Sequence, residues 1–484
     1  MNLIDLLNGL SPVETRGDTN IEVTGITKDS RAVRKGFVYI STGKGGTYLE
    51  DARKKGADVL VTNREHPGIT FPCTIIVDDP EKWPGQMASR FYAYPSRNMH
   101  IAGVTGTNGK TTVTFLIESI LKYAGKKPGV IGTITYRYGD HVIKAENTTP
   151  GAVEIQALLN QMHASGVRDV IMEVSSHALH QRRVEAVEFD VAIFTNLTHD
   201  HLDYHLNLEN YKKAKKLLFE DYLATSVKEK KYAILNIDDP AIKDFAPKAP
   251  VKVFSYSTRG YADAHLIRYE EGIEGLQFTA SLLGREIEIS SPMIGAFNAS
   301  NILASMLYGV VTDIPFSRIK EGIERLQGVP GRLERINNSR GIAVFVDYAH
   351  TPDALNNVLL LLKRLKKGKL IVVFGCGGDR DTSKRPVMGN VATSTADFSI
   401  ITSDNPRSEN PLHIIDEIRK GVNGNPYKVV ENRKEAIEEA LRMARQDDVI
   451  LIAGKGHEDY QKIGDMTYHF SDKEVVEEAL RVAT

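Results

Sequence analysis

A glycine-spaced turn between an apolar run and a helix is the strongest chemical signal in this sequence. Residues 101–104 predict a buried strand, and a helix with apolar residues at helical spacing is predicted to begin at Lys110. Glycines let a backbone wrap closely around a polyphosphate, and the N–H groups at a helix start point toward it. Lys110 is placed to neutralise phosphate charge, and the Thr111 hydroxyl is placed to bind Mg²⁺. The predicted nucleotide contacts are Gly106, Thr107, Asn108, Gly109, Lys110, Thr111 and Thr112.

The loop departs from the usual P-loop pattern at one position. That pattern has a glycine five residues before Gly109, where this chain has Val104. The segment is therefore a P-loop variant. The alternative is a glycine-rich turn between a strand and a helix that has no function.

Acidic, histidine and lysine residues follow the next predicted strands. Glu173 lies at the end of an apolar run, so we expect it at the sheet edge that carries the loop, where a second Mg²⁺ ligand is needed. The alternative for Glu173 is an acid that caps a helix. Residues 196–203 are dense in His and Asp, which suits metal binding, proton transfer or a solvated loop. Residues 211–219 contain four lysines, which composition alone assigns to a solvated helix face.

The last third of the chain repeats one arrangement four times. The apolar runs 342–346, 370–374, 398–402 and 449–453 are followed by the polar clusters 347–350, 377–380, 404–407 and 454–458. Ligands of open α/β sheets bind outside the carboxyl ends of the strands. The four clusters therefore predict a binding site that belongs to this part of the chain.

The alternation of strand-like runs and helical segments predicts an α/β fold with parallel sheets covered by helices. In the middle of the chain these runs are 170–174, 191–195 and 232–236. A length of 484 residues suggests about three domains, and turn-forming residues at 94–98 and 328–331 mark two boundaries. We expect domains at 1–97, 98–330 and 331–484.

Composition excludes several classes of function. The 61 Lys and Arg residues balance 62 Asp and Glu residues, so no net field attracts nucleic acid or an anionic membrane. Cys73 and Cys376 are too far apart in sequence to suggest a zinc site or a disulfide framework. No apolar run approaches the roughly 20 residues of a membrane span, and the first residues lack signal-peptide features. We expect a soluble protein of the cytoplasm.

Together these motifs resemble the Mur ligase family, the ATP-dependent amide-forming enzymes of peptidoglycan precursor synthesis. The resemblance covers nearly the whole chain, and the departure at Val104 is usual in that family. It implies an N-terminal domain that binds a UDP-sugar, a central P-loop-type ATPase and a C-terminal Rossmann-like domain that binds the incoming amino acid. The motifs that carry it are 106–111, 173–177, 200–203, 211–215, 295–298 with Asn301, and 347–353.

The resemblance also implies the residues of the ATPase site. In the family, the lysine that matches Lys215 is carbamylated, which turns a cation into an anion that helps to order Mg²⁺ with Glu173 and His201. The expected metal ligands are thus Thr111, Glu173, His201 and carbamylated Lys215, and the expected catalytic residues are Lys110, Glu173, His201 and Lys215. Further implied contacts to the substrate ATP are Asn298, Asn301, Arg332 and Asp347.

Contacts to the second substrate follow from the same resemblance. Ser30 matches a contact to the nucleotide-sugar, although residues 44–46 read Lys-Gly-Gly where the family usually has Asp-Gly-His. Within the family, the chain resembles the subgroup that adds the third residue to UDP-N-acetylmuramoyl-L-alanyl-D-glutamate. The matching contacts to that substrate are Asn147, Thr148, Thr149, Ser175, Gln181 and Arg183.

The amino acid implied by this subgroup is meso-diaminopimelate. It differs from lysine by a second carboxylate, which an arginine can grip through two parallel hydrogen bonds, so Arg407 predicts discrimination against L-lysine. The recognition motif is Asp404, Asn405, Pro406 and Arg407, and Arg380, Gly454 and Glu458 match further contacts.

Three other functions stay open. They are an L-lysine-adding ligase of the same family, folylpolyglutamate synthase, which shares the ATPase core, and a nucleotide switch without synthetic activity. The UDP-sugar-type segment and the recognition motif at 404–407 argue against folylpolyglutamate synthase. The Asn-Lys-x-Asp base-reading motif of GTP switches is absent from the sequence. We expect the protein to act as a monomer.

Overall fold

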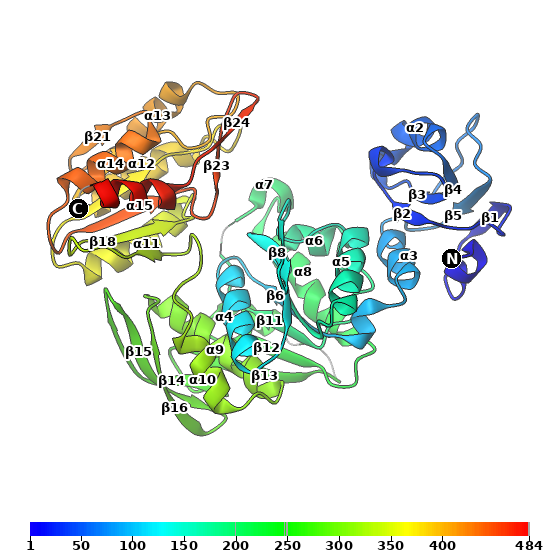
Figure 1. The fold of residues 1–484 in the computed structure, drawn as a ribbon, viewed down its shortest axis with the longest axis horizontal. Coiled ribbons are helices and arrows are strands. Elements are labelled where there is room, and N and C mark those ends of the chain that lie inside the picture. The colour runs from blue at the N-terminus through cyan, green and yellow to red at the C-terminus, as the bar shows by residue number, and fades with distance from the viewer. Residues whose placement is uncertain (199, 246, 248–249, 483–484) are drawn as a thin grey trace. The chain divides into compact units, whose positions relative to one another are not determined.

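The computed structural model describes residues 1–198, 200–245, 247 and 250–482, without the side chains of residues 44–46, 202, 203 and 482. Contacts divide the chain into two compact units, and Figure 1 shows the helices and strands of the chain coloured by residue number. The first unit consists of Met1–Leu266, Ala280–Ile287 and Ser300–Ile323. The second consists of Ile267–Thr279, Glu288–Ala299 and Glu324–Thr484.

The N-terminal part of the first unit is a five-stranded sheet with the order β1-β5-β4-β3-β2. Strands β2 to β5 pair in parallel, and β1 pairs with β5 in the antiparallel sense. Side chains alternate along β3, so Val38 and Ile40 enter one buried cluster and Tyr39 enters another. The elements are α1 (Leu3–Leu7), β1 (Glu14–Gly17), β2 (Gly25–Thr27), η1 (Ser30–Ala32), β3 (Phe37–Ile40), η2 (Gly43–Tyr48), α2 (Leu49–Lys54), β4 (Ala57–Thr62), β5 (Cys73–Ile76), α3 (Trp83–Phe91) and η3 (Pro95–Asn98).

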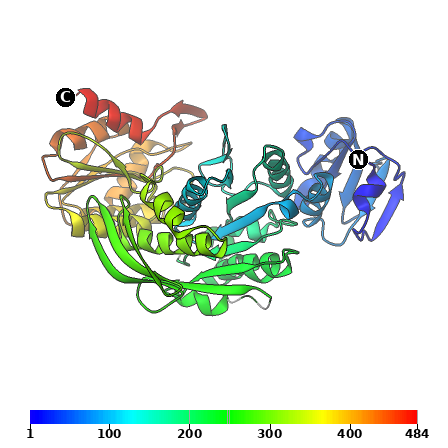
Figure 2. The same cartoon turned by 60° about the horizontal axis from the view of Figure 1, so that its bottom comes forward.

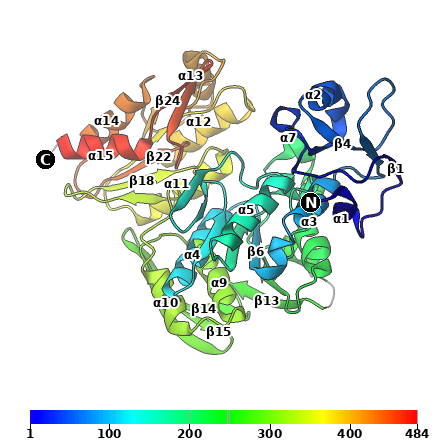
Figure 3. The same cartoon turned by 45° about the vertical axis from the view of Figure 1, so that its right-hand side comes forward.

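The remainder of the first unit is built on parallel strands in the order β7-β10-β6-β11-β12-β13. Strands β8 and β9 continue this sheet beyond β7 in the antiparallel sense. Helix α4 contacts β6, β7 and β10 (Figure 3). The elements are β6 (His100–Thr105), α4 (Lys110–Tyr123), β7 (Pro128–Ile131), β8 (Thr135–Tyr138), β9 (His141–Lys144), α5 (Ala152–Ala164), β10 (Asp169–Glu173), α6 (Ser176–His180), β11 (Val191–Phe194), α7 (Leu202–His205), α8 (Leu208–Leu217), the π-helix η4 (Leu218–Leu223), β12 (Tyr232–Asn236), η5 (Pro240–Asp244) and β13 (Lys252–Ser257).

Three long strands, β14 to β16, contribute residues to both units. They lie side by side in the order β16-β15-β14 and are drawn in green in Figure 2. In the first unit, β14 pairs with β13 through Ala264 and His265. These elements and the two helices that follow are β14 (Ala264–Gly272), β15 (Gly275–Leu282), β16 (Arg285–Ser291), α9 (Ala296–Val311) and α10 (Phe316–Glu324).

The second unit contains a six-stranded sheet with the order β17-β18-β22-β19-β20-β21, in which only β17 pairs in the antiparallel sense. Its two faces bury separate clusters: Val372 of β19 packs with α11, α12 and α13, whereas Val373 packs with α14 and α15. The elements are β17 (Glu334–Ile336), β18 (Ala343–Asp347), α11 (Pro352–Leu365), β19 (Leu370–Phe374), α12 (Lys384–Thr395), β20 (Phe398–Ile401), α13 (Pro411–Arg419), β21 (Tyr427–Val429), α14 (Arg433–Met443), β22 (Val449–Ala453), β23 (Tyr460–Ile463), β24 (Met466–His469) and α15 (Asp472–Val482).

The predicted α/β class with parallel sheets covered by helices is confirmed. Among the described residues, no helix is long and apolar enough to cross a membrane. Cys73 and Cys376 are both buried, and neither forms a disulfide. The boundaries predicted near residues 97 and 330 stay a prediction.

Candidate active site

The turn between β6 and α4 adopts backbone angles that favour glycine at two points. Gly106 and Gly109 have φ angles of 149° and 88°. A Cβ atom at Gly106 would collide with the Thr195 hydroxyl, and one at Gly109 would collide with the Asn301 amide. The turn therefore depends on bare backbone, which can approach a phosphate closely.

Lys110 is the first residue of α4, and its side chain folds back over the turn. Its Nζ donates hydrogen bonds to the carbonyl oxygens of Gly106 at 2.8 Å and Thr107 at 2.9 Å. A positive charge thus lies over the predicted phosphate site.

The end of β11 fixes the loop from the side. Asn196 accepts hydrogen bonds from the backbone N–H groups of Thr107 at 2.8 Å and Asn108 at 2.9 Å. The Thr195 hydroxyl donates to the Asn108 carbonyl at 2.6 Å. Thr112 is buried in the first turn of α4. The loop is therefore preformed by hydrogen bonds from the neighbouring strand.

Glu173 ends β10, next to β6, as the sequence predicts. Its buried carboxylate accepts hydrogen bonds from the Thr111 hydroxyl at 3.0 Å and from the Thr133 hydroxyl at 2.9 Å, both at Oε2. The Thr133 N–H group donates to Oε1 at 2.9 Å. The helix α6 that follows is capped by Ser175. Glu173 therefore faces the loop through Thr111 and does not cap that helix.

Lys215 differs from its lysine neighbours because it is only 1% exposed. Its Nζ donates to the Gly106 carbonyl at 2.8 Å and lies 4.4 Å from the centroid of the Tyr211 ring. Burial, followed by the charge of Lys110, lowers the pKa of Lys215 well below the ordinary value for lysine. The structure thus brings Lys110 and Lys215 to the same carbonyl of the loop.

His201 lies in the polar segment after β11. Its Nε2 is 3.5 Å from an Asp200 carboxylate oxygen, and its ring centroid is 4.8 Å from that of His177. His199 and the side chain of Asp203 lie outside the described residues. In the described part of the chain, no group of three or more His, Cys, Asp and Glu residues is arranged to hold a metal ion. The oxygen atoms that do meet, from Thr111 and Glu173, are of the type that Mg²⁺ prefers.

Four residues predicted to bind the UDP-sugar dipeptide form one hydrogen-bonded chain. Gln181 Oε1 accepts from Arg183 Nε at 3.0 Å and Nη2 at 2.8 Å. Arg183 Nη1 donates to the Thr149 carbonyl at 2.9 Å. The Thr149 hydroxyl accepts from the Ser175 N–H group at 3.0 Å and donates to the Glu173 carbonyl at 2.8 Å. The predicted substrate contacts are therefore coupled to the strand end that carries Glu173.

Three further residues predicted to bind this substrate have separate partners. The Asn147 carbonyl accepts from the Tyr136 hydroxyl at 2.6 Å. The hydroxyl oxygens of Thr148 and Thr133 lie 3.1 Å apart, close to Glu173. Ser30 is buried in the N-terminal sheet region, and its hydroxyl is the first cause of the lowered pKa of Asp51.

The remaining predicted ATP contacts are divided between the two units. Asn301 belongs to the first unit, where its amide lies against Gly109. In the second unit, Asn298 Nδ2 donates to the Ile294 carbonyl at 2.8 Å, and the Arg332 guanidinium lies 4.9 Å from the centroid of the Tyr348 ring. Burial raises the pKa of Asp347, which ends β18.

Predicted amino-acid contacts meet at the strand ends of the second unit. Asn405 Nδ2 donates to Glu458 Oε2 at 2.9 Å. A Cβ atom at Gly454 would lie 2.8 Å from an Asp404 carboxylate oxygen, so this close approach requires glycine. The clusters after β20 and β22 therefore lie together and bring the carboxylates of Asp404 and Glu458 into one acidic site.

Two arginines lie beside this acidic site. A Cβ atom at Gly377 would lie 3.0 Å from Arg407 Nη1 and 4.0 Å from Arg380 Cγ, so both side chains flank that glycine. Arg407 Nη1 donates to the Gly378 carbonyl at 2.5 Å. The backbone of Arg407 has a φ angle of 53°, and two hydrogen bonds hold it: its N–H donates to the Lys462 carbonyl at 3.0 Å and its carbonyl accepts from Gly464 at 2.6 Å. The preceding residue, Pro406, accepts from the Glu409 N–H group at 3.1 Å.

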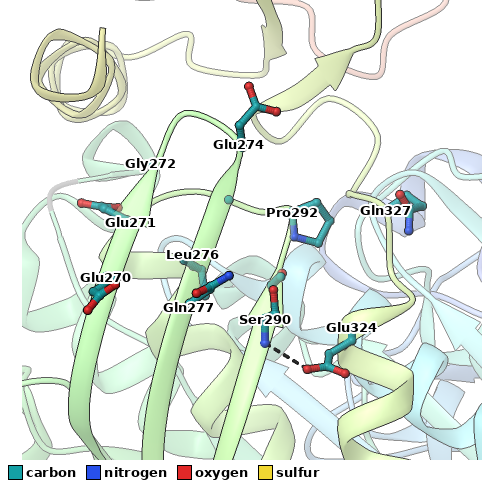
Figure 4. Close-up of a pocket in the computed structure, with 12 residues that line it drawn as sticks. Glu270, Glu271, Gly272, Glu274, Leu276, Gln277, Ser290, Pro292, Glu324 and Gln327 are labelled. Carbon is teal, nitrogen blue, oxygen red and sulfur yellow. Dashed lines mark hydrogen bonds between the residues drawn. The ribbon is translucent and has the colours of Figure 1, made fainter. Parts of the chain in front are cut away.

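A pocket of about 620 Å³ lies on β14 to β16 of the second unit, and none of the predicted site residues lines it (Figure 4). Its acidic side chains have structural partners. Glu271 accepts from the Gly295 N–H group at 3.2 Å, Glu274 pairs with Arg335 at 2.7 Å, and Glu324 accepts from the Ser290 N–H group at 3.0 Å. The predicted chemistry is therefore located elsewhere in the chain.

Comparisons with known proteins agree with this geometry. The Mur ligase middle domain matches residues 104–309, and the Mur ligase, glutamate ligase domain matches residues 331–456. The UDP-N-acetylmuramoyl-L-alanyl-D-glutamate–2,6-diaminopimelate ligases of Caldanaerobacter subterraneus subsp. tengcongensis and Geobacter metallireducens are 41% and 43% identical to the chain. Each alignment covers 99% of this chain and 99% or 98% of the relative. A solved structure of a ligase with the same name gives a TM-score of 0.73 at 30% identity, covering 100% of this chain and 99% of that one.

The chain belongs to the Mur ligase family. The resemblance expected from the motifs is thus confirmed, and this Mur ligase is an ATP-dependent, amide-forming enzyme. The roles of individual site residues stay predictions, although the structure brings many of those residues together.

Several residues of this Mur ligase site were not identified from the sequence. Thr133 reaches Glu173 from the segment after β7, and no motif marks it. Two further residues are fully buried cations. Lys455 Nζ donates to Asn405 Oδ1 at 3.1 Å, and Arg433 Nη1 lies 3.9 Å from an Asp404 carboxylate oxygen. Residues 211, 214, 215, 218 and 219 have the spacing of one helix face, and all five are buried. Lys215 is the charged residue on this face, so the spacing is a sequence signal that distinguishes it from the neighbouring lysines.

Proposed function

We propose that this Mur ligase adds meso-diaminopimelate to UDP-N-acetylmuramoyl-L-alanyl-D-glutamate in peptidoglycan precursor synthesis, at the expense of ATP. The curated relatives named above carry this activity in their names. The observation that carries the proposal is that Arg380 and Arg407 flank Gly377 while Glu458 joins Asn405 in the same unit. Such a site offers cations to carboxylates and an anion to an ammonium group, which are the groups of diaminopimelate.

The reaction proceeds in two steps. An oxygen of the D-glutamate side-chain carboxylate attacks the γ-phosphorus of ATP, so that the bond to the β-phosphate oxygen breaks and an acyl phosphate and ADP form. The neutral amine of diaminopimelate then attacks the acyl carbon, the bond from that carbon to the phosphate oxygen breaks, and inorganic phosphate leaves together with one amine proton as the amide forms. Because the reacting groups of the first step are all anionic, Lys110 over the loop lowers the barrier electrostatically.

Mg²⁺ is the metal that the site fits. Thr111 and Glu173 offer a hydroxyl and a carboxylate next to the loop, and His201 and carbamylated Lys215 are the further ligands that we propose. When bound, Mg²⁺ would neutralise negative charge on the phosphates of ATP.

Carbamylation of Lys215 is supported by its environment. Only a neutral amine reacts with CO₂: the nitrogen lone pair forms a bond to carbon, and one proton leaves to give the carbamate anion. Burial and the neighbouring Lys110 favour the neutral amine of Lys215. The buried environment also gives a reason to convert this lysine into an anion that can pair with a cation.

The domain roles follow from the same proposal. We propose that residues 1–97 bind the UDP-sugar through Ser30, that residues 98–330 bind ATP, and that residues 331–484 bind the amino acid. We also propose that the enzyme acts as a cytoplasmic monomer, which size-exclusion chromatography with light scattering tests directly.

An ADP-release assay with a panel of amino acids tests the proposed function. Purified enzyme receives ATP, Mg²⁺, UDP-N-acetylmuramoyl-L-alanyl-D-glutamate and either meso-diaminopimelate, L-lysine or L-glutamate. We expect ADP release with meso-diaminopimelate only. A comparable rate with L-lysine identifies the lysine-adding ligase instead. Activity with folate and glutamate in place of the UDP-sugar identifies folylpolyglutamate synthase, and turnover without an acceptor indicates a nucleotide switch.

A further inference from the structure

A buried lysine contacts two of the residues proposed to bind diaminopimelate, Asn405 and Glu458. Lys455, in the loop after β22, is 0% exposed. Its Nζ donates to Asn405 Oδ1 at 3.1 Å and to Glu458 Oε2 at 3.2 Å. Burial of a full charge is costly unless it is paired, so the position of Lys455 calls for a specific reason.

The first reason is the orientation of the Asn405 amide. An ammonium group carries donors only, so Lys455 can face this amide only through Oδ1. The Lys462 N–H group donates to the same oxygen at 3.0 Å. The Nδ2 group of Asn405 is therefore turned toward Glu458, where it donates to Oε2 at 2.9 Å. Lys455 and Asn405 thus hold one oxygen of Glu458 from two directions.

The second reason is charge. Burial alone would raise the pKa of Asp404, but the positive charges of Arg433 and Lys455 outweigh this effect and lower it. Arg433 is itself paired with the fully buried Asp472 at 2.7 Å. Lys455 and Arg433 therefore favour the ionised form of the Asp404 carboxylate, which lies in the same site as Glu458.

We propose that Lys455 is a positioning residue for amino-acid recognition, which holds Asn405 and Glu458 in the orientation that receives the ammonium group of the incoming amino acid. The inference rests on the proposed function, because it assumes that the second unit binds an amino acid. The Glu458 side chain is 16% exposed and can meet a ligand, whereas Lys455 is covered. Lys455 therefore acts through Glu458 and does not touch the substrate.

Steady-state kinetics of Lys455→Met test this inference. We expect the KM for meso-diaminopimelate to rise roughly 10- to 100-fold, because a bond to a charged group is lost. The KM values for ATP and for the UDP-sugar dipeptide should change less than about twofold. Lys455→Arg, which keeps charge and donors, should recover part of the loss. Lys420→Met, at an exposed position at the end of α13, is the matched control. An unchanged KM for diaminopimelate, or an equal change for all three substrates, overturns the inference.

A double-mutant cycle separates positioning from general stabilisation. If Lys455 acts through Glu458, the KM for diaminopimelate of the Lys455→Met/Glu458→Gln double variant should be close to that of Glu458→Gln alone. If the two residues act independently, the fold-changes in KM of the two single variants multiply in the double variant. If Lys455→Met does not fold, Lys455→Gln replaces it under the same criteria, since it keeps a donor for Asn405 Oδ1 without the charge. If the wild-type enzyme adds L-lysine instead of diaminopimelate, the proposed function fails. The inference is then still measured on lysine, which carries the same ammonium group.

Discussion

The hydroxyl of Thr111 donates a hydrogen bond to Glu173 Oε2 over 3.0 Å, and this contact joins the first turn of α4 to the end of β10. The Thr133 hydroxyl reaches the same oxygen at 2.9 Å. Two hydroxyl groups and a carboxylate thus converge beside the glycine turn, although they come from three separate segments of the chain.

Glu173→Gln should lose most of the activity and raise the Mg²⁺ concentration required for ADP release by at least about 10-fold, because an amide is a much weaker ligand than a carboxylate. Thr111→Ser should keep the hydroxyl and most of the activity, whereas Thr111→Val should resemble Glu173→Gln. ADP release titrated with Mg²⁺ measures these effects. Glu229→Gln, at an exposed position, is the control, and similar behaviour of the two glutamine variants would contradict the assignment.

Lys110→Ala should reduce ATP turnover by at least about 100-fold while the fold stays intact, since water cannot replace the lost cation at equal strength. ADP release and thermal melting on one preparation measure both properties. Lys127→Ala, at an exposed position after α4, should leave both unchanged. Normal turnover of Lys110→Ala would rule out the phosphate-binding role of the loop.

Lys215→Ala should be nearly inactive, and added short carboxylic acids should restore part of the activity by supplying the missing anion. Lys212, Lys213 and Lys216 should tolerate alanine, because only Lys215 is buried among these four. A carbamate signal in ¹³C NMR under ¹³CO₂ should be present in the wild-type enzyme and absent from Lys215→Ala. If the four alanine variants behave alike, these lysines form a solvated helix face without a special role for Lys215.

Arg407→Ala should lose most of the activity with meso-diaminopimelate and reduce the discrimination against L-lysine. A site built to hydrogen-bond a group rejects analogues without that group by roughly 10⁴-fold. Rates with both amino acids, measured at several concentrations, give the change in this ratio. Arg419→Ala, at the exposed end of α13, is the matched control. A wild-type enzyme that adds lysine at a comparable rate would contradict the role of Arg407.

Stability should fall as the pH drops from about 6.5 to about 4. Burial lowers the pKa of His205 to about 4, and the nearby histidines, His177, His180 and His201, add to this effect. An unfolded histidine titrates near about 6.5, so unfolding takes up a proton within this window and acid favours the unfolded state. His205→Gln should reduce the slope of Tm against pH between these limits. His413→Gln, at an exposed position, should keep the wild-type slope.

The parallel sheets could be predicted from the sequence because their strands are short, continuous apolar runs. Strands β12, β19 and β22 coincide with the predicted runs, and β6 extends the predicted run by one residue at each end. The antiparallel strands β8 and β9 were not predicted, since β9 is exposed throughout and carries no apolar run. The long strands β14 to β16 contain few continuous buried residues: β15 alternates buried residues with more exposed ones, and only the first residue of β14 is buried, which weakens the apolar signal.

The candidate site could be predicted only where its residues share a motif. The glycine turn and the segment 404–407 are contiguous, so their spacing carries the information. Lys455 lies within a predicted cluster, yet its burial depends on Asn405 and Glu458 being folded around it. Thr133 reaches Glu173 across 40 residues of sequence, a pairing that only the register of β7 and β10 creates.

The burial of both cysteines has a consequence for experiments. Burial raises the pKa of Cys73 to about 11 and that of Cys376 to about 12, so almost no thiolate is present at neutral pH. Maleimide dyes should therefore leave the native chain unlabelled. A cysteine introduced at an exposed position in each unit, such as Lys127 and Lys420, would then carry the dye selectively. Energy transfer between the two dyes would follow the distance between the units during turnover, without any need to remove native thiols first.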